Sequence, residues 1–286
     1  ALAVTDRAHF RSYFEDQLYQ GVTFAPFPEC NDASQVTTDE ALALLRAAFQ
    51  QGAPNGDPIG AVIVEPVQGR AGVRIPPDGF MAALSDVAIE EGVMVIADEI
   101  FTGLGRCGSM LASEQLGLRP DIVCLGKILG GGLPLSACLS SRSVLSAWPE
   151  NDGEAIHTNT FLGHPLSCAT ALAVLDVLEH LGVPECARVL GSRLLSELQE
   201  SLKDTEKVLE VRGCGLMIGI ELVTADGSPW KGGAVRVAEA ALGQGLILLP
   251  AGEHGHVVEL TPSAFLSENQ VAHSVAVLSS IIQAIH

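Results

Sequence analysis

Residues 123–134 read VCLGKILGGGLP and place a single lysine between an apolar run and a glycine triplet. The chain has four lysines, and Lys127 is the only one in its first two hundred residues. Buried strands of α/β sheets read as apolar, β-branched runs, and ligands bind just outside their carboxyl ends. The stretch therefore predicts a strand at Ile122–Leu125, with the Lys127 amine at the sheet edge where ligands bind.

Apolar β-branched runs alternate with helical patterns around this stretch, which is typical of a parallel α/β sheet. The strands that this pattern predicts are Gly60–Val64, Val93–Ala97, Ile122–Leu125 and Leu135–Leu139. The predicted helices are Thr38–Gln50, Asp78–Glu91 and about His164–His180. The first of these helices follows Thr37-Thr-Asp-Glu40, which has the spacing of a capping box.

A different pattern begins after the turn Gly182-Val-Pro-Glu185. It predicts a helix near Cys186–Leu202, an apolar run at Leu216–Ile220, a helix near Ala234–Leu242, short strands at Leu246–Leu249 and His256–Leu260, and a last helix from Ser267. We therefore expect a large α/β domain at residues 1–182, with a mainly parallel sheet, and a smaller α+β domain at residues 183–286.

Charge and composition argue against several classes of protein. The formal net charge of −18 repels nucleic acid and anionic membrane surfaces, so neither is an expected partner. The seven cysteines are irregularly spaced and form no C-x-x-C pair, which argues against a disulfide framework and against a metal site. Neither a signal-peptide pattern nor an apolar run of bilayer length is present, so we expect a cytoplasmic protein.

Two predicted strands end in residues of opposite charge. The run Val93–Glu99 carries Asp98 at its end, and the 127 − 98 = 29 residues from there to Lys127 fit one strand–helix–strand unit. We therefore expect both side chains in one crevice. One interpretation is a structural ion pair, or a lysine that extends to water. The other is a desolvated amine that forms a Schiff base with the aldehyde of pyridoxal phosphate, while the acid keeps the pyridine nitrogen protonated.

Gly103-Leu-Gly-Arg-Cys-Gly108 matches the G-x-G-x-x-G pattern of dinucleotide-binding folds and follows a predicted strand. However, Asp98 and Glu99 stand between that strand and the first glycine, where they would repel a pyrophosphate. The next strand ends in Lys127 rather than in the acid that would hold a ribose. We therefore disfavour a dinucleotide site.

The chain carries four motifs in order. They are EPVQG at 65–69, IADEI at 96–100 with Thr102-Gly103 after it, LGK at 125–127 with GGGLP at 130–134 after it, and TNTFLGHP at 158–165. Two later stretches, VRGCGLM at 211–217 and ELTP at 259–262, extend the set. Together they resemble the class III aminotransferases, pyridoxal-phosphate enzymes of fold type I that include ornithine, acetylornithine and 4-aminobutyrate aminotransferases.

The resemblance implies a role for several residues. Lys127 corresponds to the Schiff-base lysine, which also moves the substrate proton, and Asp98 to the partner of the pyridine nitrogen. Thr160 corresponds to the threonine that binds the phosphate of the neighbouring subunit's cofactor, which implies a homodimer with shared sites. Without the motif, Thr160 would be a helix-capping or loop residue. The implied activity moves an amino group from an amino donor to a 2-oxo acid.

The sequence departs from the family pattern at three positions. Phe101 occupies the cofactor-binding position where many members have a residue, often Gln, that bonds the cofactor's phenolic oxygen. Arg70 stands where relatives commonly have Glu, and Glu259 where they commonly have Arg. Arg70 and Glu259 are either two unrelated surface charges or an inverted substrate-binding pair. In the second case, Arg70 meets the substrate carboxylate.

A further departure concerns the N-terminal part of the chain. Family members carry a Gly-Ser/Thr phosphate loop and an aromatic residue that stacks on the cofactor ring, and neither is found in residues 1–36. We therefore expect a truncated member in which phosphate binding depends largely on Thr160. Two alternatives to an aminotransferase stay open: an aminomutase or racemase of the same family, and a truncated remnant without catalysis.

Overall fold

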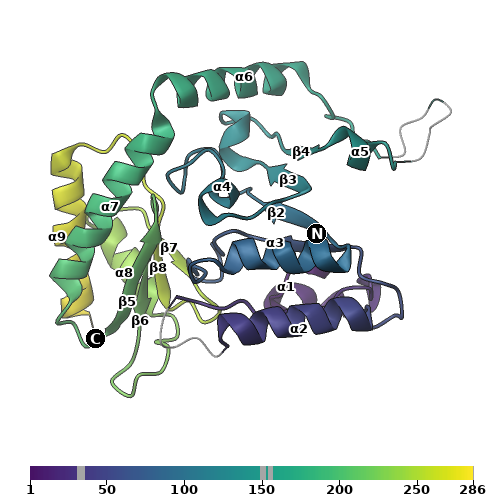
Figure 1. Cartoon of the computed structure of the whole chain (residues 1–286). Coiled ribbons are helices and arrows are strands. Elements are labelled where there is room, and N and C mark those ends of the chain that lie inside the picture. The colour runs from purple at the N-terminus through teal and green to yellow at the C-terminus, as the bar shows by residue number, and fades with distance from the viewer. Residues whose placement is uncertain (31–35, 149–152, 154–156, 286) are drawn as a thin grey trace.

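The computed structural model describes residues 1–30, 36–148, 153 and 157–285, which contain two four-stranded sheets (Figure 1). The strands of the first sheet, in spatial order, are β1 (Ala61–Val64), β2 (Met94–Asp98), β3 (Ile122–Leu125) and β4 (Ala137–Ser140). Strands β1, β2 and β3 are parallel, and β4 pairs antiparallel with β3. The carboxyl ends of β2 and β3 therefore meet at one edge of the sheet.

Helices α2 (Thr38–Gln51) and α3 (Phe80–Glu91) lie side by side (Figure 1). Helix α3 packs on the first sheet, and α2 packs on α3. Helix α2 begins with a capping box. The Thr37 side chain accepts a hydrogen bond from the Glu40 backbone N–H, and the Glu40 side chain accepts one from the Thr37 backbone N–H. Their apolar faces form one core with the strands, including Leu45, Met81, Leu84, Val95 and Ala97. This core fixes the direction in which β2 and β3 end.

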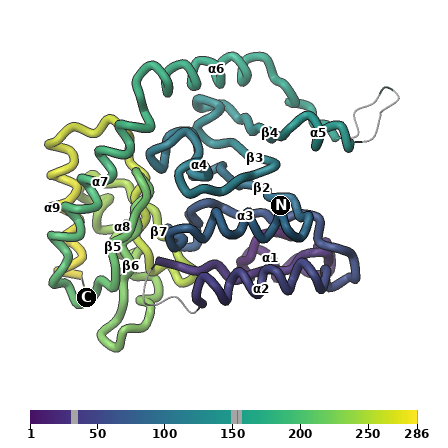
Figure 2. Tube along the Cα trace, in the orientation of Figure 1, coloured from purple at the N-terminus to yellow at the C-terminus, as the bar shows by residue number. Residues whose placement is uncertain are grey.

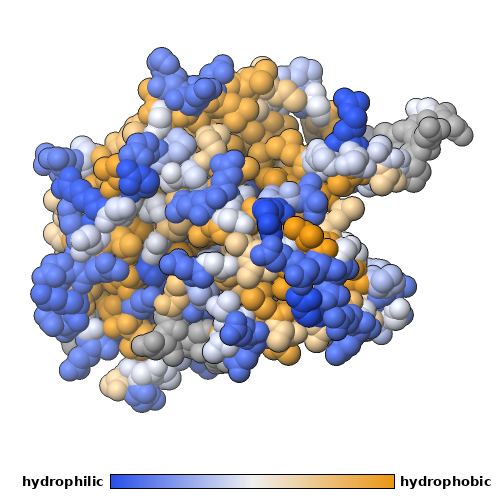
Figure 3. All heavy atoms as spheres, viewed as in Figure 1, coloured by the Kyte–Doolittle hydropathy of each residue, from blue (hydrophilic) through white to orange (hydrophobic). Residues whose placement is uncertain are grey.

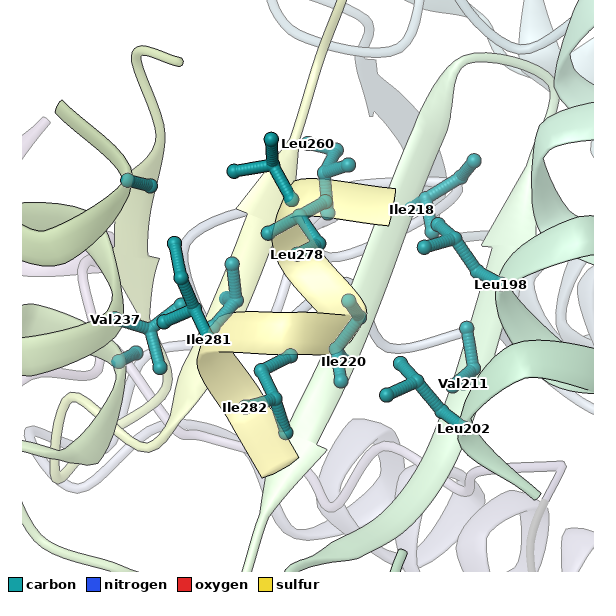
Figure 4. Close-up of a cluster of buried hydrophobic side chains, with 14 of the residues drawn as sticks. Leu198, Leu202, Val211, Ile218, Ile220, Val237, Leu260, Leu278, Ile281 and Ile282 are labelled. Atoms are coloured by element: carbon teal, nitrogen blue, oxygen red, sulfur yellow. The ribbon is translucent and has the colours of Figure 1, made fainter. Parts of the chain in front are cut away.

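The second sheet has the strand order β5 (Val208–Cys214), β6 (Met217–Leu222), β8 (Val257–Leu260) and β7 (Leu249–Ala251), with every neighbouring pair antiparallel. The helices that pack on it are α7 (Val183–Leu202), α8 (Gly233–Leu242) and α9 (Glu268–Ala284). Figure 4 shows Leu198, Ile218, Ile220, Leu278 and Ile282 converging between the sheet and these helices. The second sheet is thus built on a core of its own.

Helix α6 (Pro165–His180) connects the two parts of the chain, as the trace in Figure 2 shows. It passes the first sheet and then turns by 61° into α7. Among the described residues, no single helix has the length and apolar content needed to cross a bilayer. Helices α6 and α7 meet that criterion only when counted together across their bend.

The remaining elements are short. They are η1 (Leu2–Val4), α1 (Ala8–Arg11), η2 (Glu15–Gln17), α4 (Ala112–Leu116), η3 (Lys127–Gly130) and α5 (Arg142–Leu145).

The predicted α/β fold with a mainly parallel sheet is confirmed, and one local expectation is corrected. The strand predicted at Leu246–Leu249 is wrong, because β7 begins only at Leu249. Gly245 has a φ of +82° in the turn before it, and the Ile247 side chain is 86% exposed, so the apolar residues there have no sheet neighbour. Strand β5 was not predicted. The domain boundary at 182/183 stays a prediction and falls between the two sheets.

Candidate active site

Lys127 lies immediately beyond the carboxyl end of β3, at the first residue of η3. Its backbone φ is +49°, a left-handed conformation that costs a residue with a side chain roughly 1–3 kcal/mol. The following turn is tied to α6, because the Thr170 hydroxyl donates a hydrogen bond of 3.0 Å to the Gly130 carbonyl. Such strain persists only where the surrounding structure imposes it, and residues held this way cluster at functional sites.

Asp98 ends β2 and is the register partner of Cys124 on β3, so it lies close to the point where Lys127 begins η3. It is half-buried, and its Oδ1 accepts a hydrogen bond of 3.1 Å from the Ile100 N–H. The structure therefore brings the predicted amine and carboxylate to neighbouring strand ends.

The pKa of the Lys127 amine lies below its usual value, and burial is the main cause. The charges of Asp98, Glu65 and Glu259 oppose this shift, and Arg70 adds to it. The Lys127 residue as a whole is exposed, so burial acts on only part of its side chain. A lowered pKa increases the fraction of neutral amine at pH 7, and the neutral amine is the nucleophilic form.

Phe101 packs against Lys127. The Lys127 Nζ lies 4.2 Å from the centroid of the Phe101 ring, within cation–π distance. This contact favours the charged amine and so opposes the effect of burial. The ring offers no hydrogen bond, but it covers one side of the amine.

Glu65 belongs to this group, although the sequence pattern assigned it no role. Its Oε2 accepts a hydrogen bond of 3.1 Å from the Gly69 N–H, which closes the turn before Arg70. The pKa of Glu65 is raised chiefly by burial; the Gly69 hydrogen bond and the charge of Lys127 act against this, and the charges of Asp98 and Glu259 add to it. The only signal for Glu65 in the sequence was its place at the start of the EPVQG motif.

Arg70 and Glu259 face each other, with 3.6 Å between Arg70 Nη1 and Glu259 Oε2. Glu259, on β8, is fully buried, and neither carboxylate oxygen has a hydrogen-bond partner among the described residues. Arg70 is half-exposed and donates from Nη1 to the Pro250 carbonyl at 3.0 Å. Burial raises the pKa of Glu259, and the charges of Arg70, Lys127 and Arg106 oppose that effect.

The glycine-rich segment 103–108 packs against the second part of the chain. A Cβ at Gly105 would lie 3.3 Å from Val183, and one at Gly108 would lie 3.1 Å from Arg188. Arg106 donates to the Pro262 carbonyl at 2.6 Å, a contact that no sequence pattern indicated. The glycines thus have a packing role, because they allow this segment to approach α7 closely.

A cavity of about 640 Å³ lies between the loop after β2, helix η3, helix α6 and residues 261–265. Lys127 lines it together with apolar residues that include Phe101, Ile128, Val174 and Phe265. Figure 3 shows apolar surface beside α6 on the face in view. Leu166, Leu172 and Val177 of α6 are exposed. The amine therefore opens into a largely apolar space.

Thr160 is not part of this group. It is exposed in the turn before α6, where the His164 ring caps the helix by accepting from the Ser167 N–H at 3.3 Å. Thr160 does not line the cavity that contains Lys127. Its role at a neighbouring subunit's cofactor stays a prediction. Among the described residues, no group of three or more His, Cys, Asp or Glu side chains is placed to hold a metal ion.

Comparisons with known proteins show which family the chain resembles. The chain is 37% identical to an acetylornithine aminotransferase of Methanothermobacter thermautotrophicus over 79% of its length, and 35% identical to a 4-aminobutyrate aminotransferase of Mycobacterium leprae over 94%. It spans only 55% and 60% of those proteins. A Bacillus anthracis aminotransferase structure matches 99% of the chain with a TM-score of 0.89 at 27% identity, and the chain covers 66% of it.

The family model described as "Aminotransferase class-III" matches residues 1–282. The match includes both sheets and all the predicted site residues. The chain therefore belongs to the class III aminotransferase family.

Proposed function

We propose that this protein is a pyridoxal-phosphate-dependent aminotransferase that moves an amino group from an amino donor to a 2-oxo acid, with Lys127 as the Schiff-base lysine. The observation that carries the proposal is the Lys127 amine, whose pKa burial lowers, held at the end of β3 beside Asp98 at the end of β2. Family membership supports the transfer of an amino group in general.

At this edge of the sheet, Lys127 and Asp98 fit the aldehyde and the ring nitrogen of pyridoxal phosphate. When bound, the cofactor supplies an electron-withdrawing ring that acidifies the Cα proton of an attached amino compound. The Asp98 carboxylate would hold a proton on the ring nitrogen. The Lys127 Nζ would bind the aldehyde carbon, and once released it would take up the Cα proton and return it. Phe101 would exclude water from one side of the amine.

Arg70 is the proposed binding group for a substrate carboxylate. Its guanidinium is half-exposed and so can meet an anion, while Glu259 behind it is buried. The charge of Glu259 and the Pro250 carbonyl hold the guanidinium in place. This arrangement supports the inverted pair rather than two unrelated surface charges, which would both be solvated.

The proposed assembly is a cytoplasmic homodimer with shared active sites. The exposed position of Thr160, apart from the Lys127 cavity of its own chain, supports a contact with the cofactor of a second subunit. The partners of the reaction are then a small amino donor and a 2-oxo acid.

Reversing the charges of Arg70 and Glu259 tests the pair. Arg70→Glu and Glu259→Arg each place like charges side by side, so each should lower the free energy of unfolding and raise KM for a carboxylate substrate. The double exchange restores opposite charges and should recover part of both losses. We expect a coupling free energy of about 0.5–3 kcal/mol from urea unfolding of the four proteins.

The pair Arg119–Asp86 provides the matched control, because both of its side chains are exposed. The same exchange there should give a smaller coupling free energy, since water screens exposed pairs. A double variant of Arg70 and Glu259 no better than the worse single variant would show that the two residues do not act together.

The reaction itself is tested by incubating the chain with pyridoxal phosphate, a donor and a 2-oxo acid. Ornithine, acetylornithine and 4-aminobutyrate are suitable donors, with pyruvate or 2-oxoglutarate as acceptor. We expect a new amino acid that is formed only when the acceptor is present. Rearranged or racemised donor without an acceptor would instead identify an aminomutase or racemase. If this chain captures no cofactor, the result would support the alternative of a truncated remnant without catalysis.

A further inference from the structure

Cys124 on β3 and Cys138 on β4 are direct register partners in the antiparallel pair of strands. The Cys124 carbonyl accepts a hydrogen bond of 3.0 Å from the Glu99 N–H, so the backbone groups of Cys124 face β2. In a strand, the N–H and C=O of one residue point to the same side. The Cys124–Cys138 pair is therefore a non-hydrogen-bonded pair.

This type of pair has the spacing that a disulfide needs. Opposite residues of a non-hydrogen-bonded pair have Cα atoms about 4.5 Å apart, with their side chains closer than in the other type of pair. Disulfides bridge Cα atoms roughly 4.4–6.8 Å apart. The two side chains also lie on the same face of the sheet, because directly opposite residues always do.

We propose that Cys124 and Cys138 form a redox-active dithiol that closes to a cross-strand disulfide. Cys138 is exposed on β4, the outermost strand of the first sheet in the part of the chain that the structure describes, and Cys124 is partly buried on β3. Both are free thiols in the structure. Cys138 is thus the thiol that meets an oxidant first, and Cys124 is the resolving thiol.

With a peroxide as oxidant, the Cys138 thiolate attacks the O–O bond and becomes a sulfenic acid while water leaves. The Cys124 thiolate then attacks the Cys138 sulfur, the S–S bond forms, and a second water leaves. One hydrogen peroxide and two thiols thus give one disulfide and two waters, with peroxide reduced and the thiols oxidised.

The dithiol adjoins the proposed cofactor site. Asp98 is the register partner of Cys124 on the other side, so its carboxylate shares a sheet face with both sulfurs. The pKa of Cys124 is raised by burial first, then by the charges of Cys138 and Asp98 and by the side-chain contact with Cys138. The disulfide would link β4 covalently to β3 next to Asp98. Any effect of this link on cofactor capture rests on the proposed function, whereas formation of the disulfide does not.

Cys107 and Cys214 provide a matched comparison within the same chain. They also lie close together, since the Cys214 thiol reaches the Cys107 carbonyl at 3.6 Å. Both are buried, with exposed fractions of 1% and 8%, so a water-borne oxidant does not reach them in the folded chain. Exposure, rather than proximity alone, should decide which pair oxidises.

Peptide mapping of the folded chain after hydrogen peroxide treatment tests the proposal. Cleavage after Arg, Lys and Glu, except before Pro, places the four cysteines on separate peptides: 115–127 holds Cys124, 128–142 holds Cys138, 107–114 holds Cys107 and 213–221 holds Cys214. We expect 115–127 joined to 128–142, two hydrogens lighter than the sum, and released by dithiothreitol. In Cys138→Ser, Cys124 should stay fully alkylatable, and Cys186→Ser should behave like the parent.

Two outcomes would overturn the proposal. One is a treated protein in which Cys138 is oxidised to sulfinic acid while Cys124 stays a free thiol. The other is a linkage between 107–114 and 213–221 with both strand cysteines still reduced. The mass readout needs neither cofactor nor activity, so it stays valid even if the proposed function fails.

Discussion

Replacing Lys127 with alanine should abolish covalent capture of pyridoxal phosphate by the chain. In the parent protein, borohydride should fix the cofactor to a single lysine, because the Lys127 amine has a lowered pKa and lies beside Asp98. Without it, amino transfer should fall by at least about 10²–10⁴-fold, the usual contribution of a positioned proton-transfer group. Mass spectrometry of the reduced protein gives the site, and product formation gives the rate.

Two variants make this result specific. Lys203→Ala removes an exposed lysine that is paired with Glu200 at 2.6 Å, and it should leave the label unchanged. Lys127→Arg keeps a positive charge but lacks a nucleophilic amine, so it should behave like the alanine variant. A label that persists in Lys127→Ala, or that lies on another lysine in the parent, would contradict the assignment.

The rate of capture should also depend on pH. Only the neutral amine attacks the aldehyde, so the rate should rise with pH and level off above the pKa of Lys127. Because burial lowers that pKa, the plateau should begin below the value of about 10.4 that is usual for lysine. Asp98→Asn removes a charge that raises the Lys127 pKa, and it should move the plateau to lower pH still.

Replacing Arg212 with alanine should lower the free energy of unfolding by about 3–5 kcal/mol, the usual cost of removing one partner of a buried ion pair. Arg212 is only 7% exposed and contacts Glu221 at 2.5 Å and Glu210 at 3.0 Å. It also donates to the carbonyls of Val73 at 2.9 Å and Gly72 at 2.6 Å. Its removal takes one cation from the two carboxylates and leaves the Gly72 and Val73 carbonyls without this donor. Urea unfolding at neutral pH measures the loss.

The pH dependence of stability separates this role from simple packing. Burial acts to raise the pKa of Glu221, but hydrogen bonds and charges from His256 and Arg212 outweigh it and lower the pKa to about 2. A carboxylate with a lowered pKa stabilises the fold above its unfolded pKa of about 4.3, and this stability is lost as pH falls toward 2. In Arg212→Ala, the acid-induced loss should therefore be smaller.

Arg188→Ala serves as the control for the Arg212 variant, because Arg188 pairs with Glu185 at the surface. It should change the free energy of unfolding far less, and the pH dependence of stability should stay that of the parent. An Arg212 variant as stable as this control would show that the buried contacts contribute nothing net.

The sequence predicted the elements with strong local signals. Strand β3 has the predicted bounds, Ile122–Leu125, because its apolar run is short, uninterrupted and bounded by Asp121 and Gly126. In the structure Leu125 is buried and the other three residues are partly buried. Helix α2 begins where its capping box predicts, and it extends one residue further, to Gln51. Strand β5 was missed because Arg212 and Gly213 interrupt its apolar pattern. Arg212 is held by hydrogen bonds to residues far away in the sequence, such as Gly72.

The sequence predicted which residues form the candidate site better than it predicted their burial and backbone conformation. The motifs predicted that Asp98 and Lys127 would share a crevice, and the two departures singled out Arg70 and Glu259. No local pattern could show that Glu259 is buried with no hydrogen bond from any described residue, or that Lys127 has a left-handed backbone. Both properties arise from contacts between segments that are distant in the chain, so they depend on the tertiary fold.

The loop that follows β1 is hydrogen-bonded to residues of the second sheet. Arg212 on β5 donates hydrogen bonds to the Gly72 and Val73 carbonyls of this loop. The Gly252 N–H donates to the Arg70 carbonyl at 3.2 Å. Any hinge rotation between the two sheets would therefore carry Arg70 along with the second one, while Lys127 stays with the first. The distance between the Arg70 guanidinium and the Lys127 amine would therefore change with the angle between the two sheets.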